Sequence, residues 1–208
     1  MLVSKETYDV EQLQTPKESY IFKIAVGGAG GVGKTTLLHR YLQNVFVSDT
    51  KMTVGVSFHM KDINLAVSQK KIRLSLWDLG GQQRFKFLHE SYLKGAMAGV
   101  VFFDMTRVKT MVQVKDWVWM FRKFTSPDLP IVLGGTKFDA VKDPISADEM
   151  NLYARETIED LGLQLYVPTS SKTGEGVDEI FTYIVDTLLA KSQNRNDGTN
   201  RIGGDRLG

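Results

Sequence analysis

The sequence lacks cysteine altogether among its 208 residues. That absence excludes a disulfide scaffold, a thiolate zinc site and a cysteine nucleophile. The sequence also lacks an unbroken apolar run of the roughly 18 residues that a membrane-spanning helix requires. No sign of charge dominates, because 26 basic residues stand against 24 acidic ones, which disfavours nucleic acid as a partner. The first residues have no apolar core of a signal peptide, so we expect a cytoplasmic protein.

What is present is the composition of a globular protein, 42% hydrophobic and 24% charged. Both ends of the chain are polar and fall outside the regular pattern of apolar segments. We therefore predict a flexible N-terminal arm over residues 1–19, one domain over 20–190 and a disordered polar tail over 191–208.

Short apolar runs alternate with longer segments of helical spacing. The runs predict six strands, at residues 20–26, 58–67, 72–77, 100–103, 131–133 and 165–167. Helices are predicted over 35–42, 112–124 and 177–189, and another follows a Ser-x-x-Glu capping box at Ser146 and ends near Gly162. Of Trp117, Trp119 and Phe121, we expect one to face a partner and the others to join the core. The alternation predicts an α/β fold: a six-stranded, mostly parallel sheet with one antiparallel edge strand and helices on both faces.

A glycine-rich segment follows the first predicted strand and opens the first predicted helix. Residues 28–35, Gly-Ala-Gly-Gly-Val-Gly-Lys-Thr, match the pattern G-x-x-x-x-G-K-[ST], and we call them the phosphate loop. The glycines let successive backbone N–H groups surround phosphate oxygens, and the helix N-terminus adds partial positive charge. Lys34 would reach the β- and γ-phosphates of a nucleotide, and the Thr35 hydroxyl would coordinate Mg²⁺. A plain glycine-rich turn is the alternative, which the strand–loop–helix context disfavours.

Asp78 ends the third predicted strand and is followed by Leu-Gly-Gly-Gln. A carboxylate across from the phosphate loop suits a position associated with Mg²⁺. Gly81 can donate its backbone N–H to a γ-phosphate, and Gln82 can orient a water molecule for attack. Alone, this pattern is typical of the exit of a strand, but together with the phosphate loop it favours the functional interpretation. Thr53, in the loop before the second strand, has no support from such a pattern.

The segment Thr136-Lys137-Phe138-Asp139 follows another buried strand and is a candidate base pocket. The Asp139 carboxylate could accept hydrogen bonds from N1–H and the 2-amino group of guanine, donors that adenine lacks in that arrangement. The stem of Lys137 could cover the face of the base. After the last strand, Ser170-Ser171-Lys172 could contribute through backbone N–H groups, although this signal is weak alone.

Taken together, these motifs resemble those of the Ras superfamily of small GTPases over residues 21–190, within the P-loop NTPase class. The segment Thr-Val-Gly-Val-x-Phe from Thr53 is similar to the Rab branch and implies that Thr53 is the switch I threonine. The stretch around Phe46 resembles the one whose aromatic ring packs edge-on to guanine. Segments such as residues 77–82, 103–107 and 135–139 look most like the fungal septation-initiation GTPases, and an archaeal Ras-like GTPase is similar too.

The resemblance implies a set of site residues. Catalytic roles fall on Gln82, Lys34, Gly81 and Thr53, and Mg²⁺ ligation or association falls on Thr35, Thr53 and Asp78. Nucleotide binding falls on Gly28, Gly30, Gly31, Val32, Gly33, Lys34, Thr35, Thr36, Phe46, Thr53, Gly81, Thr136, Lys137, Asp139, Ser170, Ser171 and Lys172. Two of these depart from the family pattern, because Thr136 replaces the usual Asn and Ser171 replaces Ala. We expect Thr136 to hold guanine less tightly than Asn would.

The resemblance also implies partners. No arginine occurs between Arg40 and Arg73, so switch I has no arginine finger of its own and fast hydrolysis would need one from an activating protein. We expect a monomer that meets an exchange factor, a GTPase-activating protein and effectors through its switch regions. We expect no direct lipid anchor, because cysteine is absent and the second residue is Leu2. The alternatives are an ATP-dependent P-loop enzyme and a nucleotide-loaded scaffold without useful turnover.

Overall fold

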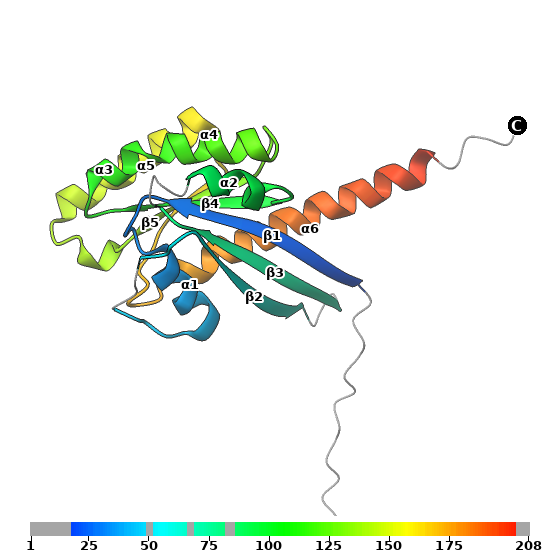
Figure 1. Ribbon diagram of the computed structural model, residues 1–208, viewed down its shortest axis with the longest axis horizontal. Helices are drawn as coiled ribbons and strands as arrows, with labels where there is room; N and C mark the ends of the chain where they lie inside the picture. The colour runs from blue at the N-terminus through cyan, green and yellow to red at the C-terminus, as the bar shows by residue number, and fades with distance from the viewer. Residues whose placement is uncertain (1–17, 49–51, 66–68, 82–85, 203–208) are drawn as a thin grey trace, which may run out of the picture.

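The computed structural model describes residues 18–48, 52–65, 69–81 and 86–202, in the last range without the side chains of 86–88 and 195–202. The elements of this part, in chain order, are β1 (Glu18–Gly28), α1 (Lys34–Gln43), β2 (Val56–Leu65), β3 (Lys70–Leu79), α2 (Lys86–Leu93), β4 (Ala98–Asp104), α3 (Val108–Val112), α4 (Val114–Phe124), β5 (Ile131–Thr136), the 3₁₀ turn η2 (Phe138–Ala140), α5 (Pro144–Leu161), β6 (Leu165–Pro168) and α6 (Val177–Ile202) (Figure 1).

One sheet organises these elements. Its strand order is β2-β3-β1-β4-β5-β6, and only the β2–β3 pair is antiparallel. The predicted fold class, a mostly parallel six-stranded sheet with one antiparallel edge strand, is confirmed. Because the other five strands are parallel, their carboxyl ends and the loops that follow them meet at one edge of the sheet, where ligands bind in open α/β folds.

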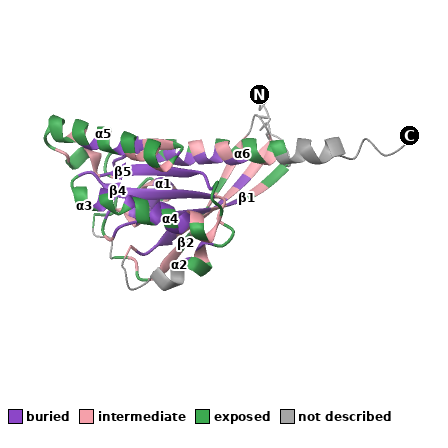
Figure 2. Cartoon of the chain, turned by 90° about the horizontal axis from the view of Figure 1, so that it is seen from above, coloured by how far each residue is buried: buried purple, intermediate pink, exposed green. Residues whose placement is uncertain are grey.

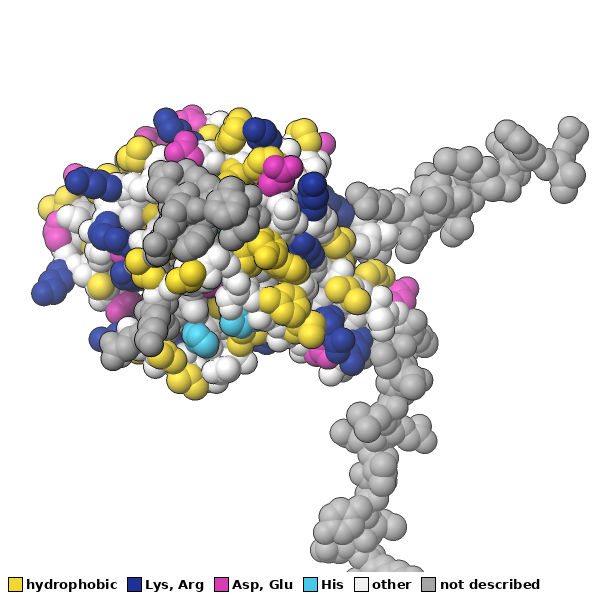
Figure 3. Space-filling model, viewed as in Figure 1, with side chains coloured by type: hydrophobic (Ala, Val, Ile, Leu, Met, Phe, Trp, Pro, Cys, Tyr) yellow, Lys and Arg dark blue, Asp and Glu magenta, His cyan; other side chains and the backbone are white. Residues whose placement is uncertain are grey.

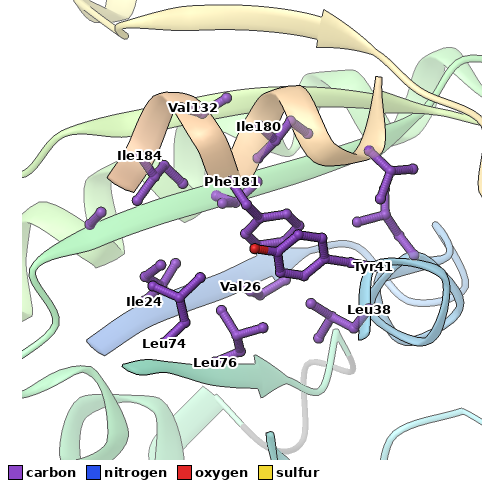
Figure 4. Close-up of a cluster of buried hydrophobic side chains, with 14 of the residues drawn as sticks. Ile24, Val26, Leu38, Tyr41, Leu74, Leu76, Val132, Ile180, Phe181 and Ile184 are labelled. Carbon is purple, nitrogen blue, oxygen red and sulfur yellow. The ribbon is translucent and has the colours of Figure 1, made fainter. Parts of the chain in front are cut away.

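Two apolar cores lie on the two faces of the sheet. On one face, α1 and α6 pack against the strands, and Tyr41 of α1 stacks on Phe181 of α6 with ring centroids 3.8 Å apart (Figure 4). On the other face, side chains of α2, α3, α4 and α5 form the second core. Figure 2 shows the buried strands enclosed between exposed helical faces, so the sheet is covered on both sides. This layering explains why the central strands read as unbroken apolar runs.

Helix α4 approaches the sheet closely because glycines lie beneath it. A Cβ added at Gly27 would lie 2.5 Å from the Trp117 ring, and one added at Gly99 would lie 2.6 Å from Phe121. Trp117 and Phe121 are buried, whereas Trp119 is 63% exposed. The prediction that two of these aromatics join the core is confirmed, and that Trp119 faces a partner stays a prediction.

The start of α5 differs from the prediction. The N-cap is Asp143, whose carboxylate accepts hydrogen bonds from the N–H groups of Ile145 and Ser146, so Ser146 lies inside the helix. The capping box predicted at Ser146 is therefore wrong. Pro144 at the first helical position has its φ fixed near the helical value and needs no hydrogen-bond acceptor, which moves the start of the helix forward.

Other boundaries also differ. The helix predicted over 112–124 corresponds to α4, while α2 and the short α3 had no counterpart in the predicted elements. Helix α6 continues to Ile202, whereas the sequence predicted a disordered tail from residue 191. Its apolar turns nucleate the helix, and no proline follows Val177, so the polar residues can propagate it. The predicted arm lies outside the described residues up to 17, and residues 203–208 of the tail lie outside them too. Among the helices that the structure describes, none has both the length and the apolar character to cross a bilayer.

Candidate functional site

The phosphate loop connects the end of β1 to the start of α1. Gly28, Gly31 and Gly33 adopt φ angles of 134°, 69° and 95°, which side chains with a Cβ rarely allow. Gly33 is the N-cap of α1, and the first turn of that helix holds no acidic side chain. The first backbone N–H groups of a helix have no partner within it, so this end of α1 suits an anion.

Lys34 folds back over the phosphate loop. Its side chain is only 5% exposed, and Nζ donates to the carbonyl oxygens of Gly28 at 2.8 Å and Ala29 at 3.0 Å. Burial lowers the pKa of Lys34 to about 8, and the negative charge of Asp78 opposes this shift. A buried ammonium group has lost its hydration and is destabilised. A phosphate bound beside it would stabilise the charged form by providing an opposite charge and hydrogen-bond acceptors.

Three oxygen-bearing side chains meet at the mouth of the loop. The hydroxyl oxygens of Thr35 and Thr53 lie 2.7 Å apart, and both hydroxyls are within hydrogen-bond contact of Asp78 Oδ2, that of Thr53 at 3.3 Å. We call Thr35, Thr53 and Asp78 the oxygen cluster. Thr53, which no motif predicted, therefore lies beside Thr35 and Asp78, which the motifs did predict.

The oxygen cluster fits a magnesium ion. Asp78 is completely buried, and its Oδ1 has no hydrogen-bond partner among the described residues. Burial raises the pKa of Asp78, while the hydrogen bond from Thr35 and the charge of Lys34 pull it down. A buried carboxylate with an unsatisfied oxygen is stabilised by a cation, and hydroxyl and carboxylate oxygens are the ligands that Mg²⁺ prefers.

The loop before β2 and the segment after β3 are both fastened beside the phosphate loop. The N–H of Gly80 donates to the carbonyl of Gly55 at 2.8 Å. Gly81 lies so close to the loop that an added Cβ would come within 2.6 Å of the Gly28 carbonyl oxygen. His89 of α2, which is buried, has Nε2 3.2 Å from the Gly80 carbonyl oxygen. Gln82, the predicted water-orienting residue, lies outside the described residues.

The packing at Gly81 leads to a prediction. Gly81→Ala should push this segment off the phosphate loop and lower GTP hydrolysis on the order of 10²-fold, the cost of displacing one donor from the transition state. GDP affinity should change by no more than about 3-fold, because GDP lacks the phosphate that the Gly81 N–H would meet. Single-turnover hydrolysis and GDP titration measure the two quantities. Gly95→Ala, at a glycine with positive φ and open space around it, is the control; equal losses in both variants would refute this role.

A cavity of about 410 Å³ continues from the phosphate loop toward the end of β5. Its lining residues are Gly31, Val32, Gly33, Thr36, Phe46, Ser48, Thr136, Lys137, Asp139, Ala140, Ser171 and Lys172. Ser170 adjoins it, because its hydroxyl donates to Asp139 Oδ1 at 2.6 Å. The cavity thus joins the two segments proposed for the base with the predicted aromatic, Phe46, and adds Ser48, which sequence reasoning missed.

Thr136 has a structural task in this arrangement. Its buried hydroxyl oxygen lies 2.6 Å from the Val32 carbonyl oxygen and 2.9 Å from that of Phe103. The shorter side chain that replaces the family's Asn therefore still links the phosphate loop to the sheet.

An ionic cluster that sequence reasoning missed supports the same loop. The buried carboxylate of Asp104 accepts from Lys137 Nζ at 2.7 Å and Arg107 Nε at 2.8 Å, and both cations also donate to the Gly31 carbonyl. Burial alone would raise the pKa of Asp104, but the hydrogen bonds from Lys137 and Thr106 outweigh it and lower the pKa. The signal was available, because Asp104 follows an unbroken apolar run as Asp78 follows a strand.

The comparisons with known proteins agree with this geometry. A model of the Ras family matches residues 23–190. The chain is 32% identical over 201 residues to Ras-related protein Rab-4B of Homo sapiens, an alignment that covers 95% of this chain and 85% of that protein. It is 34% identical over 168 residues to the putative ras-related protein Rab-5B of Dictyostelium discoideum, covering 81% and 75% of the two chains. It is 33% identical over 180 residues to Ras-related protein Rab-12 of Mus musculus, covering 86% and 72%.

Proposed function

The chain belongs to the Ras family and is a small GTPase that binds GTP or GDP with Mg²⁺ and hydrolyses GTP, and we propose that the site built on the phosphate loop carries this activity. One observation supports the assignment above the rest: Thr53 and Gly81, from two separate loops, both lie against the phosphate loop. In this arrangement a γ-phosphate bound at the phosphate loop would contact both loops at once and keep them ordered. The finer likeness to fungal or archaeal GTPases stays a prediction.

In this proposal the chain binds the phosphates through backbone and side-chain donors. The N–H groups of the phosphate loop and the start of α1 surround the β-phosphate, and Lys34 exchanges its two carbonyl partners for phosphate oxygens. Thr35 and Thr53 would provide hydroxyl ligands for the cation, and the Asp78 carboxylate, which contacts both hydroxyls, would help to hold it. When bound, Mg²⁺ neutralises negative charge on the β- and γ-phosphates. Gly81 donates its N–H to the γ-phosphate.

The base occupies the cavity in this proposal. Asp139 accepts from N1–H and the 2-amino group of guanine, Lys137 covers one face of the ring, and Phe46 packs at its edge. The N–H groups of Ser171 and Lys172 face the 6-oxygen. Within the described residues, no observation favours an ATP-dependent enzyme or an inert scaffold.

The switch follows from these contacts. While the γ-phosphate is present, Thr53 and Gly81 remain against the phosphate loop, and its loss releases the two loops. Membership of the family implies regulators and effectors, and we propose that they meet the chain through these loops. Exposed apolar side chains lie beside them, at Met52, Val54, Phe58 and Met60. Figure 3 shows apolar side chains over β2 and β3, so a protein partner could bury apolar surface there.

Further features of the protein are proposals of the same kind. We propose a monomeric, cytoplasmic protein with no affinity for nucleic acid, divided into an arm, a GTPase domain over 20–190 and a tail. We also propose that partner proteins recruit the chain to membranes.

The role of Gln82 can be tested by substitution. Intrinsic hydrolysis should be slow, roughly 10⁻⁴ to 10⁻² per second, and Gln82→Leu should lower hydrolysis in the presence of an activating protein while leaving GDP binding intact. The reason is that leucine cannot orient the attacking water. Phosphate release and GDP titration measure the two effects, and hydrolysis that stays unchanged in this variant would remove Gln82 from the mechanism.

A further inference from the structure

Arg40 donates hydrogen bonds from all three guanidinium nitrogens, to the distant Ser171–Lys172 segment and to Asn44 at the end of its own helix. From α1, Nε donates to the Ser171 carbonyl at 2.6 Å and Nη2 donates to the Lys172 carbonyl at 2.7 Å. Nη1 donates to the carbonyl and side-chain oxygens of Asn44 at 3.0 and 3.2 Å. Several charge-assisted hydrogen bonds from one side chain suit the rigid, multidentate fork of arginine, which lysine cannot reproduce.

The two segments that Arg40 joins contain or adjoin residues that line the cavity, and we call each of these two linings a wall. Ser171 and Lys172 line one wall, and Asn44 ends α1 two residues before Phe46, which lines the other. Because a peptide unit is planar, fixing the Ser171 carbonyl also fixes the direction of the Lys172 N–H in the same unit. Asn44 adopts a left-handed conformation with φ of 55°, which ends the helix and changes the direction of the chain. The hydrogen bonds from Arg40 hold the backbone at this turn, just before Phe46.

We propose that Arg40 is a positioning residue for the guanine base, which orients the Ser171–Lys172 backbone toward the 6-oxygen and couples that wall to the segment carrying Phe46. This inference rests on the function proposed above, because it needs a base in the cavity. Arg40 does not itself line the cavity, so it acts through the backbone that it holds. Release of the nucleotide then requires both walls to move together.

The test compares nucleotides that differ at one position of the base. 6-Thio-GDP keeps N1–H and the 2-amino group but replaces the 6-oxygen with sulfur, a weaker acceptor, whereas IDP keeps the 6-oxygen and lacks the 2-amino group. In Arg40→Ala, GDP dissociation should accelerate by about 10- to 100-fold, the effect of losing one well-placed hydrogen bond and loosening the wall. The preference for GDP over 6-thio-GDP should fall toward unity, while the preference for GDP over IDP, which reports Asp139, should stay within about 3-fold of wild type.

Control variants separate positioning from stability. Arg122 of α4 also donates to two carbonyls, those of Leu161 at 2.7 Å and Gly162 at 2.9 Å, just before β6 and so at the opposite edge of the sheet. Arg122→Ala should lower the melting temperature as Arg40→Ala does and leave both nucleotide preferences unchanged. Arg40→Lys keeps the charge without the fork, and should fold and give an intermediate loss of preference at the 6-position.

Three outcomes would overturn the inference. Equal weakening of GDP, 6-thio-GDP and IDP by Arg40→Ala and Arg40→Lys would indicate a purely structural role. Unchanged dissociation in both variants would refute any role in nucleotide binding. A wild-type protein that does not prefer GDP to ADP would instead overturn the proposed function, and this inference with it.

Discussion

Asp139→Asn is expected to lower the affinity for GDP by about 10³- to 10⁵-fold, because a site built to pair with donors of the ligand is left mismatched. Asp139 ends the strand–turn segment after β5 and faces the cavity, where its Oδ1 accepts from Ser170 at 2.6 Å. An ionised carboxylate offers only acceptors, as N1–H and the 2-amino group of guanine require. In asparagine one of the two oxygens is replaced by an NH2 group, a donor that would face one of these guanine donors without forming a hydrogen bond.

The same substitution should create a new preference. Xanthine carries an oxygen where guanine carries its 2-amino group, so the asparagine oxygen and amide would pair with N1–H and that oxygen. Titration of the variant with GDP and xanthosine diphosphate measures the exchange. Asp143→Asn, which changes the exposed N-cap of α5 by the same chemistry, is the control and should bind GDP as wild type does. GDP affinity that is unaltered in Asp139→Asn would remove this residue from the base pocket.

Lys34→Met is expected to reduce GDP and GTP affinity by about 10²- to 10⁴-fold, the loss of two charge-assisted hydrogen bonds to phosphate oxygens. The folded protein without nucleotide should tolerate the change. Removing a buried ammonium relieves its desolvation, while the carbonyls of Gly28 and Ala29 lose their donor, so the free energy of unfolding should change by no more than about 2 kcal/mol. Lys23→Met is the control, because Lys23 also donates to a carbonyl, that of Lys94, and lies outside the site.

The pH dependence of Lys34 has a defined sign. Its pKa falls from 10.5 in the unfolded chain to about 8 in the folded protein, so between these values the unfolded chain binds a proton that the folded one does not. The free energy of unfolding without nucleotide should therefore rise with pH over that window through this group. Denaturant titrations at several pH values within this window give the free energy of unfolding as a function of pH for wild type and Lys34→Met. The free energy should rise more steeply with pH in wild type, and equal dependence on pH in the two proteins would contradict a lowered pKa at Lys34.

Local patterns predicted the parts of the site that are local in the chain. The phosphate loop needs only positive φ angles and a helix start, which its glycines and Lys34-Thr35 specify within eight residues. Asp78 and Asp139 could be placed because Asp78 lies at the end of β3 and Asp139 follows β5, two parallel strands that end at the same edge of the sheet. The resemblance to a known family, rather than any pattern, supplied Thr53 and Phe46.

What could not be predicted depends on contacts across the fold. Arg40 meets carbonyls 131 and 132 residues away, and no spacing along the chain encodes such a pair. Arg107 reaches the Gly31 carbonyl only because β1 and β4 are neighbours in the sheet. The predicted start of α5 was wrong for a local reason, because Asp143 and Pro144 begin the helix before the capping box at Ser146. The prediction of a disordered tail from residue 191 was wrong because extending a formed helix by one residue is much less costly than starting a new one.

Selection of guanine by the cavity beside the phosphate loop underlies the proposed function. Its most direct test is displacement of a fluorescent GDP from the wild-type chain by unlabelled GDP and ADP in the presence of Mg²⁺. We expect stoichiometric binding, with GDP competing at concentrations at least about 10³-fold lower than ADP, because Asp139 pairs with donors that adenine lacks. ADP that competes as well as GDP, or better, would contradict it.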